Sequence, residues 1–152
     1  MTISSKDLET KSAEELIQWA MDQYGLKAGL ACSFGMEDMV LINMIAKLKG
    51  PITIFTLDTG RLHEETYEIM ERVRSHYGLE IKTYFPDSGQ VEKLVRGKGF
   101  FSFKESIENR KECCAVRKIE PLNRALAELD AWVTGLRRDQ AVTRTETPKV
   151  IE

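Results

Sequence analysis

The segment that decides the fold is Ala28-Gly-Leu-Ala-Cys-Ser-Phe-Gly-Met-Glu-Asp38, together with the apolar-rich residues that continue to Lys47. Residues 28–32 are a short apolar run, residues 33–37 form a glycine-containing stretch, and the apolar-rich pattern of 38–47 is closed by Gly50-Pro51. This order indicates a strand, a loop and a helix.

The same order repeats downstream. Residues 52–57 are β-branched and apolar, which favours a strand, and Asp58-Thr-Gly-Arg61 leads into a helix that ends near Gly78. Another strand is expected over residues 79–85. Strands separated by helices of roughly 12 to 15 residues form βαβ units, and right-handed crossovers place them in one parallel sheet with helices on both faces. The predicted fold class is α/β, with one domain over residues 1–152.

Patterns on either side extend this prediction. Ser12-Ala-Glu-Glu15 has the form of a capping box, which predicts a helix over about residues 12–24. Residues 87–112 are polar and contain three glycines, so we expect a mobile connection with one short helix over 91–95. A helix over 120–130, with Pro121 near its start, and a strand over 131–134 follow. Residues 147–152 are expected to enter a further strand, so the chain is expected to stop early.

Composition limits the class of protein. The 152 residues, 42% hydrophobic and 30% charged, suit one globular domain. They contain no apolar run of the roughly 18 to 20 residues that cross a bilayer and no secretory signal, which predicts a cytoplasmic protein with no membrane association. Three cysteines, two of them adjacent, do not suit a disulfide framework and are expected to be reduced.

Charge is unevenly distributed. The whole chain has a net charge of −2, whereas residues 110–144 hold eight basic and five acidic residues, a local excess of +3. Such a segment is either an anion site or a solvated helix face with mixed charges. The acidic remainder argues against a nucleic-acid interface.

Loops that follow the predicted strands would meet at the carboxyl edge of the sheet, where α/β folds bind their ligands. In the first loop, Ser33 offers a hydroxyl, Gly35 allows close backbone approach, and amides of the next helix face an anion. The alternative is an ordinary turn in which Glu37 and Asp38 only complement the helix terminus.

Two later loops are equally ambiguous. Asp58-Thr59-Gly60-Arg61 is either a set of turn residues or a nucleotide contact, with Arg61 available for a carboxylate or phosphate. Arg137 and Arg138 follow the strand over 131–134, where they either hold phosphate or sulfate or form a basic loop paired with Asp139.

The adjacent pair Cys113-Cys114 is the most diagnostic feature. Neighbouring residues cannot both lie on one apolar helix face, and zinc ligands are usually two to four residues apart, whereas separate corners of a four-iron cluster could take adjacent thiolates. Nearby cations would offset the charge of such a cluster or simply solvate the surface. They are Arg110, Lys111, Arg117 and Lys118. Cys32, at a strand end, is expected to be a packed thiol, and no chemistry is assigned to His63 or His76.

Four motifs together resemble the sulfonucleotide reductase family over almost the whole chain. They are Cys-Ser-Phe-Gly-Met-Glu-Asp at 32–38, Leu-Asp-Thr-Gly-Arg at 57–61, Lys-Glu-Cys-Cys-Ala-Val-Arg-Lys-Ile-Glu-Pro-Leu at 111–122 and Thr-Gly-Leu-Arg-Arg-Asp-Gln at 134–140. The resemblance implies a Rossmann-like fold of the adenine-nucleotide α-hydrolase type. Its cysteine-pair branch reduces adenylyl sulfate to sulfite and AMP in sulfate assimilation and cysteine biosynthesis, using thioredoxin and a [4Fe-4S] cluster. Members restricted to the 3′-phosphorylated substrate lack the pair.

The resemblance also implies roles for individual residues. Ser33, Phe34 and Gly35 would line the phosphosulfate and ribose, Leu57 and Gly135 would lie against adenosine, and Lys118 with Arg137 and Arg138 would face the sulfate and phosphate oxygens. Thr59, Gly60 and Arg61 would complete the substrate site, and Cys113 and Cys114 would be cluster ligands. Lys118 would sit between substrate and cluster.

The sequence departs from the family pattern after these motifs. A second Cys-x-x-Cys and a terminal Glu-Cys-Gly-Leu-His-type segment are absent from the 152 residues, so the nucleophilic cysteine is expected beyond residue 152. We expect the chain to be a fragment, a short form completed by another chain as in a homo-oligomer, or a nucleotide-binding relic, and to be inactive alone. A 3′-phosphoadenylyl-sulfate reductase is the alternative activity. An ATP pyrophosphatase would carry a Ser-Gly-Gly-x-Asp-Ser-type loop, which Ser33-Phe-Gly-Met-Glu-Asp38 does not match.

Overall fold

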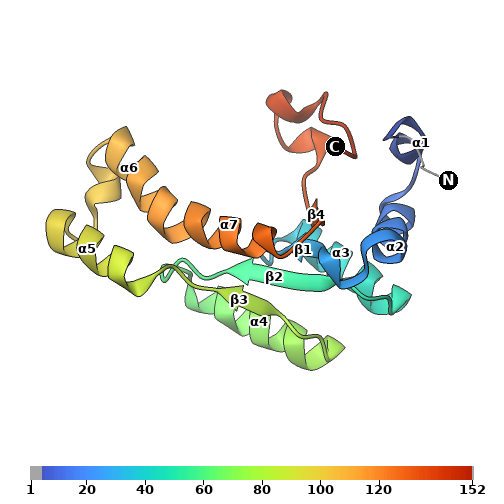
Figure 1. Ribbon diagram of the computed structural model, residues 1–152, viewed down its shortest axis with the longest axis horizontal. Helices are drawn as coiled ribbons and strands as arrows, with labels where there is room; N and C mark the ends of the chain where they lie inside the picture. Colours follow the sequence, from blue (N-terminus) through green and yellow to red (C-terminus); the bar gives the residue numbers. More distant parts are fainter. Residues whose placement is uncertain (1–4, 152) are drawn as a thin grey trace.

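The computed structural model describes residues 5–151 and contains one parallel sheet of four strands (Figure 1). The strands are β1 (Ala28–Ala31), β2 (Thr53–Leu57), β3 (Lys82–Tyr84) and β4 (Ala131–Thr134), in the order β3-β2-β1-β4. In the register, Leu30 of β1 lies between Ile54 and Val133. The predicted α/β class and parallel sheet are confirmed, and all four strand ends point to one edge.

Helices cover both faces of the sheet, as predicted. On one face, α2 (Ala13–Tyr24), α3 (Met36–Leu48) and α4 (Glu64–Tyr77) bury a core that includes Ile17, Ile42 and Val73 against Leu30 and Ile54. On the other face lies α7 (Glu120–Ala127), opposite α4 in Figure 1. Alternation along the strands divides their side chains between these layers.

Local signals explain the helix ends that were predicted correctly. Ser12 accepts a hydrogen bond from the Glu15 amide at 3.2 Å, and the Glu15 carboxylate accepts from the Ser12 amide at 2.8 Å, so the capping box forms at the start of α2. Gly78 follows α4 in the left-handed region, with a φ of 62°, a conformation that glycine adopts without steric cost.

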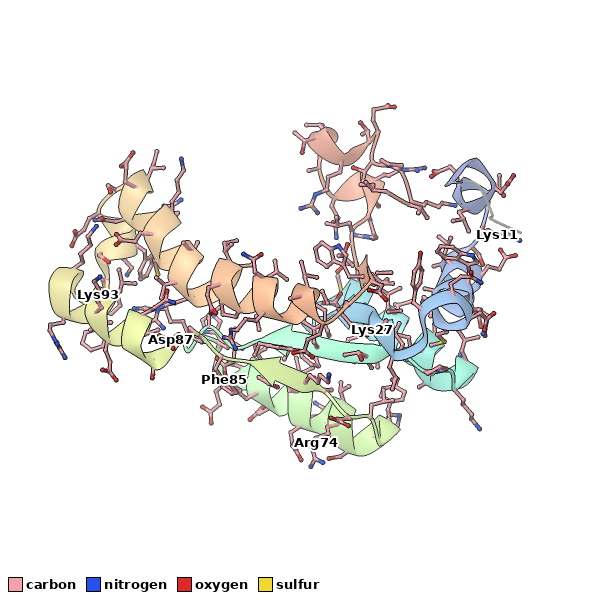
Figure 2. The ribbon with its side chains drawn as sticks, in the orientation of Figure 1. Lys11, Lys27, Arg74, Phe85, Asp87 and Lys93 are labelled. Atoms are coloured by element: carbon pink, nitrogen blue, oxygen red, sulfur yellow. The ribbon has the colours of Figure 1, made fainter. Side chains whose placement is uncertain are left out.

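The helix predicted over residues 91–95 is present, but the prediction that residues 87–112 contain a single helix is wrong. The structure places α5 over Ser88–Lys98, a 3₁₀ turn, η2, over Ser102–Lys104, and α6 over Ile107–Cys114. Asp87 accepts from the Gln90 amide at 2.9 Å and Ser106 accepts from the Asn109 amide at 3.1 Å. These two N-caps start helices whose composition is otherwise polar. Figure 2 shows Asp87 just after Phe85, where the chain leaves the sheet for α5.

The helix expected to begin at residue 120 is instead continuous with α6. A π-helical turn, η3 (Ala115–Ile119), joins α6 to α7, and the Glu120 amide donates to the carbonyl of Ala115 five residues back. Pro121 lies just after this turn and has no amide proton to donate. A widened turn accommodates a proline within a helix, and such turns are frequent at functional sites.

The predicted strand beyond residue 147 is also wrong for the described residues 147–151, which form no strand. After β4 the chain forms the 3₁₀ turns η4 (Arg138–Gln140) and η5 (Val142–Arg144) and then runs beside α1 (Ser5–Glu9). The Lys149 amide donates to Glu9 at 2.8 Å and its ammonium donates to the carbonyl of Lys11 at 2.7 Å. Within residues 5–151, no helix has both the length and the apolar character needed to span a membrane.

Candidate functional site

The loop between β1 and α3 is fixed by a buried carboxylate. Asp38 Oδ2 accepts hydrogen bonds from the Ser33 amide at 2.6 Å and from the Ser33 hydroxyl at 2.8 Å. Phe34 is buried and has a φ of 63°, a costly conformation for a residue with a Cβ. Gly35 caps α3, so the first amides of that helix face the loop. The side chain of Asp38 therefore serves the loop as well as the helix terminus.

A second buried carboxylate fixes the loop after β2. Asp58 Oδ1 accepts from the Gly60 amide at 2.8 Å and from the Tyr67 hydroxyl at 3.0 Å. The hydrogen bond to Asp58 raises the pKa of Tyr67, so its phenol stays protonated at neutral pH. Gly60 has a φ of 70°, a left-handed conformation that glycine adopts without the steric cost of a Cβ. Leu57, the residue before Asp58, is half-buried at the end of β2.

Arg117 joins this second loop to the helical run that carries the cysteine pair. It is only 8% exposed, and its Nη1 donates to the carbonyl of Thr59 at 2.8 Å. A Cβ at Gly60 would stand 3.2 Å from the same Nη1, so the glycine gives the guanidinium room. Arg117 Nε is buried and has no hydrogen-bond partner among residues 5–151. No substrate role was predicted for Arg117. Its position four residues after Cys113, on the same side of the helical run as that cysteine, is the signal that could have indicated one.

Arg61 and Lys118, two further predicted substrate residues, have different surroundings. Arg61 donates to the carbonyl of Phe100, and its guanidinium lies 4.9 Å from the centre of the Phe103 ring. It therefore ties the second loop to η2. Lys118 is exposed on the π-helical turn beside Arg117.

The loop after β4 meets the start of α3. A Cβ at Gly135 would lie 2.6 Å from Asp38 Oδ1, so only glycine fits there without displacing that carboxylate. Arg137 forms an ion pair with Glu37 at 3.2 Å, which keeps it at this edge of the sheet. Arg138 turns away, because its guanidinium pairs with Glu9 and donates to the carbonyl of Thr147. The predicted pairing of this basic loop with Asp139 is also present, at 3.5 Å from Arg137.

The sheet brings most of the predicted residues to one edge. The loops after β2, β1 and β4 leave three adjacent strands, with the Ser33–Gly35 loop in the middle. Ser33, Gly35, Gly135 and Arg137 gather around the start of α3, and Thr59 and Gly60 lie against Arg117. Arg138 and Arg61 are members of the predicted set that are held elsewhere, by Glu9 and by the carbonyl of Phe100.

The two adjacent cysteines have different environments. Cys113, at the end of α6, is buried, whereas Cys114 is exposed. Within residues 5–151, no group of three or more histidine, cysteine or acidic side chains is placed to hold a metal ion. The pair thus offers two thiols, one of them accessible.

Comparison with known proteins now decides the family. Residues 27–151 match the model of the phosphoadenosine phosphosulfate reductase domain. The chain belongs to the phosphoadenosine phosphosulfate reductase family. The fold expected from the resemblance is that of this family.

Individual relatives of the family give the scale of the similarity. The adenosine 5′-phosphosulfate reductase of Burkholderia cepacia is 51% identical over 79% of this chain and 48% of its own length. The chloroplastic 5′-adenylylsulfate reductase 1 of Arabidopsis thaliana is 47% identical over 96% of this chain and 31% of its own length. The chain therefore spans about a third to a half of these relatives.

A solved structure supports the family fold. The phosphoadenylyl-sulfate (PAPS) reductase of Candida auris, determined as a phosphate complex, superimposes with a TM-score of 0.76 at 25% identity. The match covers 93% of this chain and 72% of that protein.

Cys32 is a packed thiol, as predicted, and burial raises its pKa to about 12. Because alkylation requires the thiolate, we expect iodoacetamide at pH 8 to label Cys114 readily and Cys32 on the order of a hundredfold more slowly or not at all. Since the pKa of Cys32 is raised, its labelling should increase only as the pH approaches 12 or when the chain is unfolded. Peptide mass spectrometry over a time course measures both rates. Equal labelling of Cys32 and Cys114 in the folded protein would contradict the buried position.

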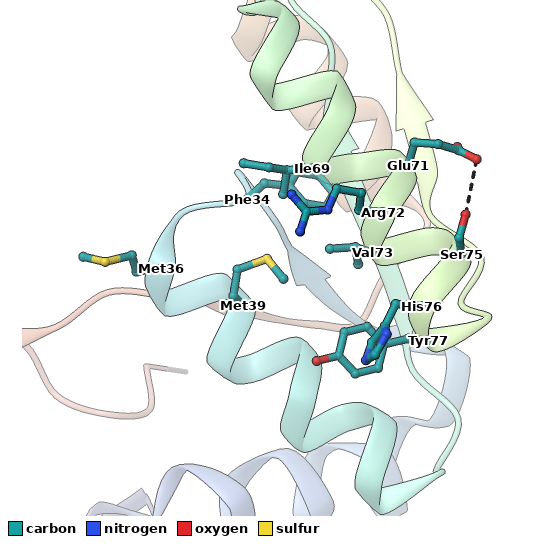
Figure 3. Close-up of a pocket in the computed structure, with 10 residues that line it drawn as sticks. All are labelled: Phe34, Met36, Met39, Ile69, Glu71, Arg72, Val73, Ser75, His76 and Tyr77. Carbon is teal, nitrogen blue, oxygen red and sulfur yellow. Dashed lines mark hydrogen bonds between the residues drawn. The ribbon is translucent and has the colours of Figure 1, made fainter.

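An open groove of about 860 Å³ lies between α3 and α4 (Figure 3). Its lining is mainly apolar and includes Met39, Val73 and Tyr77, with Phe34 at one end. Of the predicted substrate residues, Phe34 alone contributes to it. The groove lies between these two helices, whereas the convergent polar groups lie at the sheet edge, which we take as the candidate site.

Proposed function

We propose that this chain is the nucleotide-binding part of a thioredoxin-dependent adenylyl-sulfate reductase of sulfate assimilation. The observation that carries the proposal is Cys113-Cys114, placed on a helical run that Arg117 fastens to the loop at the carboxyl edge of the sheet. Relatives that match most of this chain are named adenosine 5′-phosphosulfate reductases. Their names support the unphosphorylated nucleotide over the 3′-phosphorylated one.

The substrate would bind at the sheet edge through its anionic groups. Ser33 and Gly35 offer a hydroxyl and close backbone approach at the start of α3, and Arg137 offers a guanidinium at the same place. Leu57 ends β2 and Gly135 follows β4, the two strands on either side of β1. Both residues would lie against the adenosine. Lys118, exposed beside Arg117, would add a further cation for the sulfate.

The reaction requires a nucleophilic thiol. Cys32 is buried with a raised pKa, and Cys113 and Cys114 are assigned to the cluster in this proposal, so none of the three would serve as the nucleophile. A thiolate from outside this sequence would attack the sulfur of adenylyl sulfate, and the sulfur–oxygen bond to AMP would break, leaving a protein thiosulfonate. A dithiol such as thioredoxin would then displace sulfite and become a disulfide. The chain's own part is to bind and orient the nucleotide.

The residues present are compatible with half of a [4Fe-4S] site. Cys113 and Cys114 would provide two of the four thiolates. Arg117, four residues after Cys113, is a buried cation whose Nε has no hydrogen-bond partner among residues 5–151. When bound, the cluster would supply a negative charge that Lys118 couples to the substrate. Reduced adjacent thiols also suit the proposed cytoplasmic compartment. The remaining ligands would come from residues outside this sequence, in the same protein or in another copy.

Calorimetric titration of the 152-residue chain with AMP and adenylyl sulfate tests the nucleotide-binding part of the proposal. We expect both to bind, and Arg137→Ala to weaken AMP binding about fivefold because it removes a charged contact. Arg138→Ala is the matched control and should change affinity less, since Glu9 holds that side chain away. No affinity for any adenine nucleotide would refute the proposal.

The complete enzyme tests the activity. It should release sulfite from adenylyl sulfate with reduced thioredoxin, and should do so far faster than from the 3′-phosphorylated nucleotide. A preference for the 3′-phosphorylated nucleotide would favour the alternative activity. Binding without sulfite release from either would leave a nucleotide-binding module.

A further inference from the structure

The Glu37 carboxylate interacts with the hydrogen-bond donors that an oxyanion would use at this edge of the sheet. Its Oε1 accepts from the Gln140 side-chain amide at 3.1 Å and pairs with Arg137 at 3.2 Å. Gln140 in turn accepts from the Arg137 amide at 3.2 Å, so the loop after β4 closes on one carboxylate. The other oxygen, Oε2, lies 3.5 Å from the point where a Cβ at Gly35 would stand.

The carboxylate also uses the start of α3. A hydrogen bond from its own backbone amide, together with Gln140 and Arg137, lowers the pKa of Glu37, so the group is ionised at neutral pH. A helix-terminal amide, a side-chain amide and a guanidinium are the donors with which proteins bind phosphate and sulfate esters. In this structure the Glu37 carboxylate engages the side-chain amide of Gln140 and the guanidinium of Arg137.

We propose that Glu37 is an internal counter-anion that competes with the tetrahedral oxyanion of the nucleotide for Arg137 and Gln140. This inference rests on the proposed function and deepens it, because it makes Glu37 a specificity-determining residue of the same site. A bound phosphate or sulfate ester displaces the carboxylate from Arg137, and the loop after β4 then closes on the ligand. An uncharged nucleoside lacks the charge to displace it.

Asp139 provides a matched comparison. Its carboxylate pairs with the same arginine, at 3.5 Å, but its side chain is 74% exposed, against 24% for Glu37. Glu37, in contrast, stands in the first turn of α3 and also accepts from Gln140. Removing either negative charge raises the local potential by a similar amount, whereas only removal of the Glu37 charge weakens the hold of that side chain on both Arg137 and Gln140.

The experiment measures binding of AMP and of inorganic phosphate to the 152-residue chain and to its Glu37→Gln and Asp139→Asn variants by calorimetry. We expect Glu37→Gln to bind both ligands about three- to tenfold more tightly than the unmodified chain. Asp139→Asn should change either affinity by less than about twofold, because a highly exposed pair contributes little. Adenosine, which has no oxyanion, should not gain affinity from Glu37→Gln.

The outcomes separate this inference from the proposed function. Weaker binding by Glu37→Gln, or equal gains in both variants, would overturn the competition. If AMP binds none of the three proteins, the proposed function fails, and the phosphate titration still decides the inference. Tighter phosphate binding by Glu37→Gln alone then supports it, and three equal or absent phosphate affinities overturn it.

Discussion

Replacing Arg117 by alanine should lower the free energy of unfolding by about 2 to 3 kcal/mol. The substitution removes a buried guanidinium and leaves the carbonyl of Thr59, 58 residues away in the chain, without its 2.8 Å donor. It also opens a cavity beside Gly60, where Nη1 now fills the space. Urea denaturation followed by far-ultraviolet circular dichroism measures the loss.

Two further variants test whether the stability lost in Arg117→Ala comes from the hydrogen bond to Thr59. Arg110→Ala removes an exposed arginine from the same helical run and should cost less than about 0.5 kcal/mol. Arg117→Met keeps most of the side-chain volume but has no donor, so it should fall between the native chain and Arg117→Ala. If Arg117→Ala is as stable as Arg110→Ala, the contact with Thr59 does not hold the helical run to the loop.

The central part of the fold could be predicted because its signals are local. The apolar run of 28–32 and the β-branched run of 52–57 each lie beside a loop and a helix of matching period, and chirality then orders the units in one sheet. The full length of α5 and all of α6 were missed because these helices are polar and start at the N-caps Asp87 and Ser106. Periodicity does not register a helix that lacks an apolar stripe.

The candidate site was predictable only as far as strand order determines it. Ser33, Gly135 and Arg137 follow adjacent parallel strands, so they had to share an edge. The side-chain directions depend on partners far away in the chain: Arg138 pairs with Glu9, and Arg117 pairs with Thr59. Such contacts follow from the packed structure and leave no pattern in a single sequence.

Replacing Asp38 by alanine should lower the free energy of unfolding by about 2 kcal/mol and weaken AMP binding by about tenfold or more. Asp38 is 5% exposed and accepts both the amide and the hydroxyl of Ser33, at 2.6 and 2.8 Å. Without it, those donors lose a charged acceptor, and the loop loses two hydrogen bonds that help to hold Phe34 at its φ of 63°. The loop that presents the start of α3 should therefore relax.

Glu64→Ala is the matched control, because Glu64 is also an acidic residue in the first turn of a helix, α4, but is exposed. Both substitutions remove a favourable charge from a helix N-terminus, which accounts for about 0.3 to 1 kcal/mol. Any further loss of unfolding free energy in Asp38→Ala is attributed to the hydrogen bonds with Ser33. Urea denaturation and AMP calorimetry on both variants measure the difference. If the two variants lose equal stability and keep equal AMP affinity, Asp38 acts only on the helix terminus, and the β1–α3 loop is an ordinary turn.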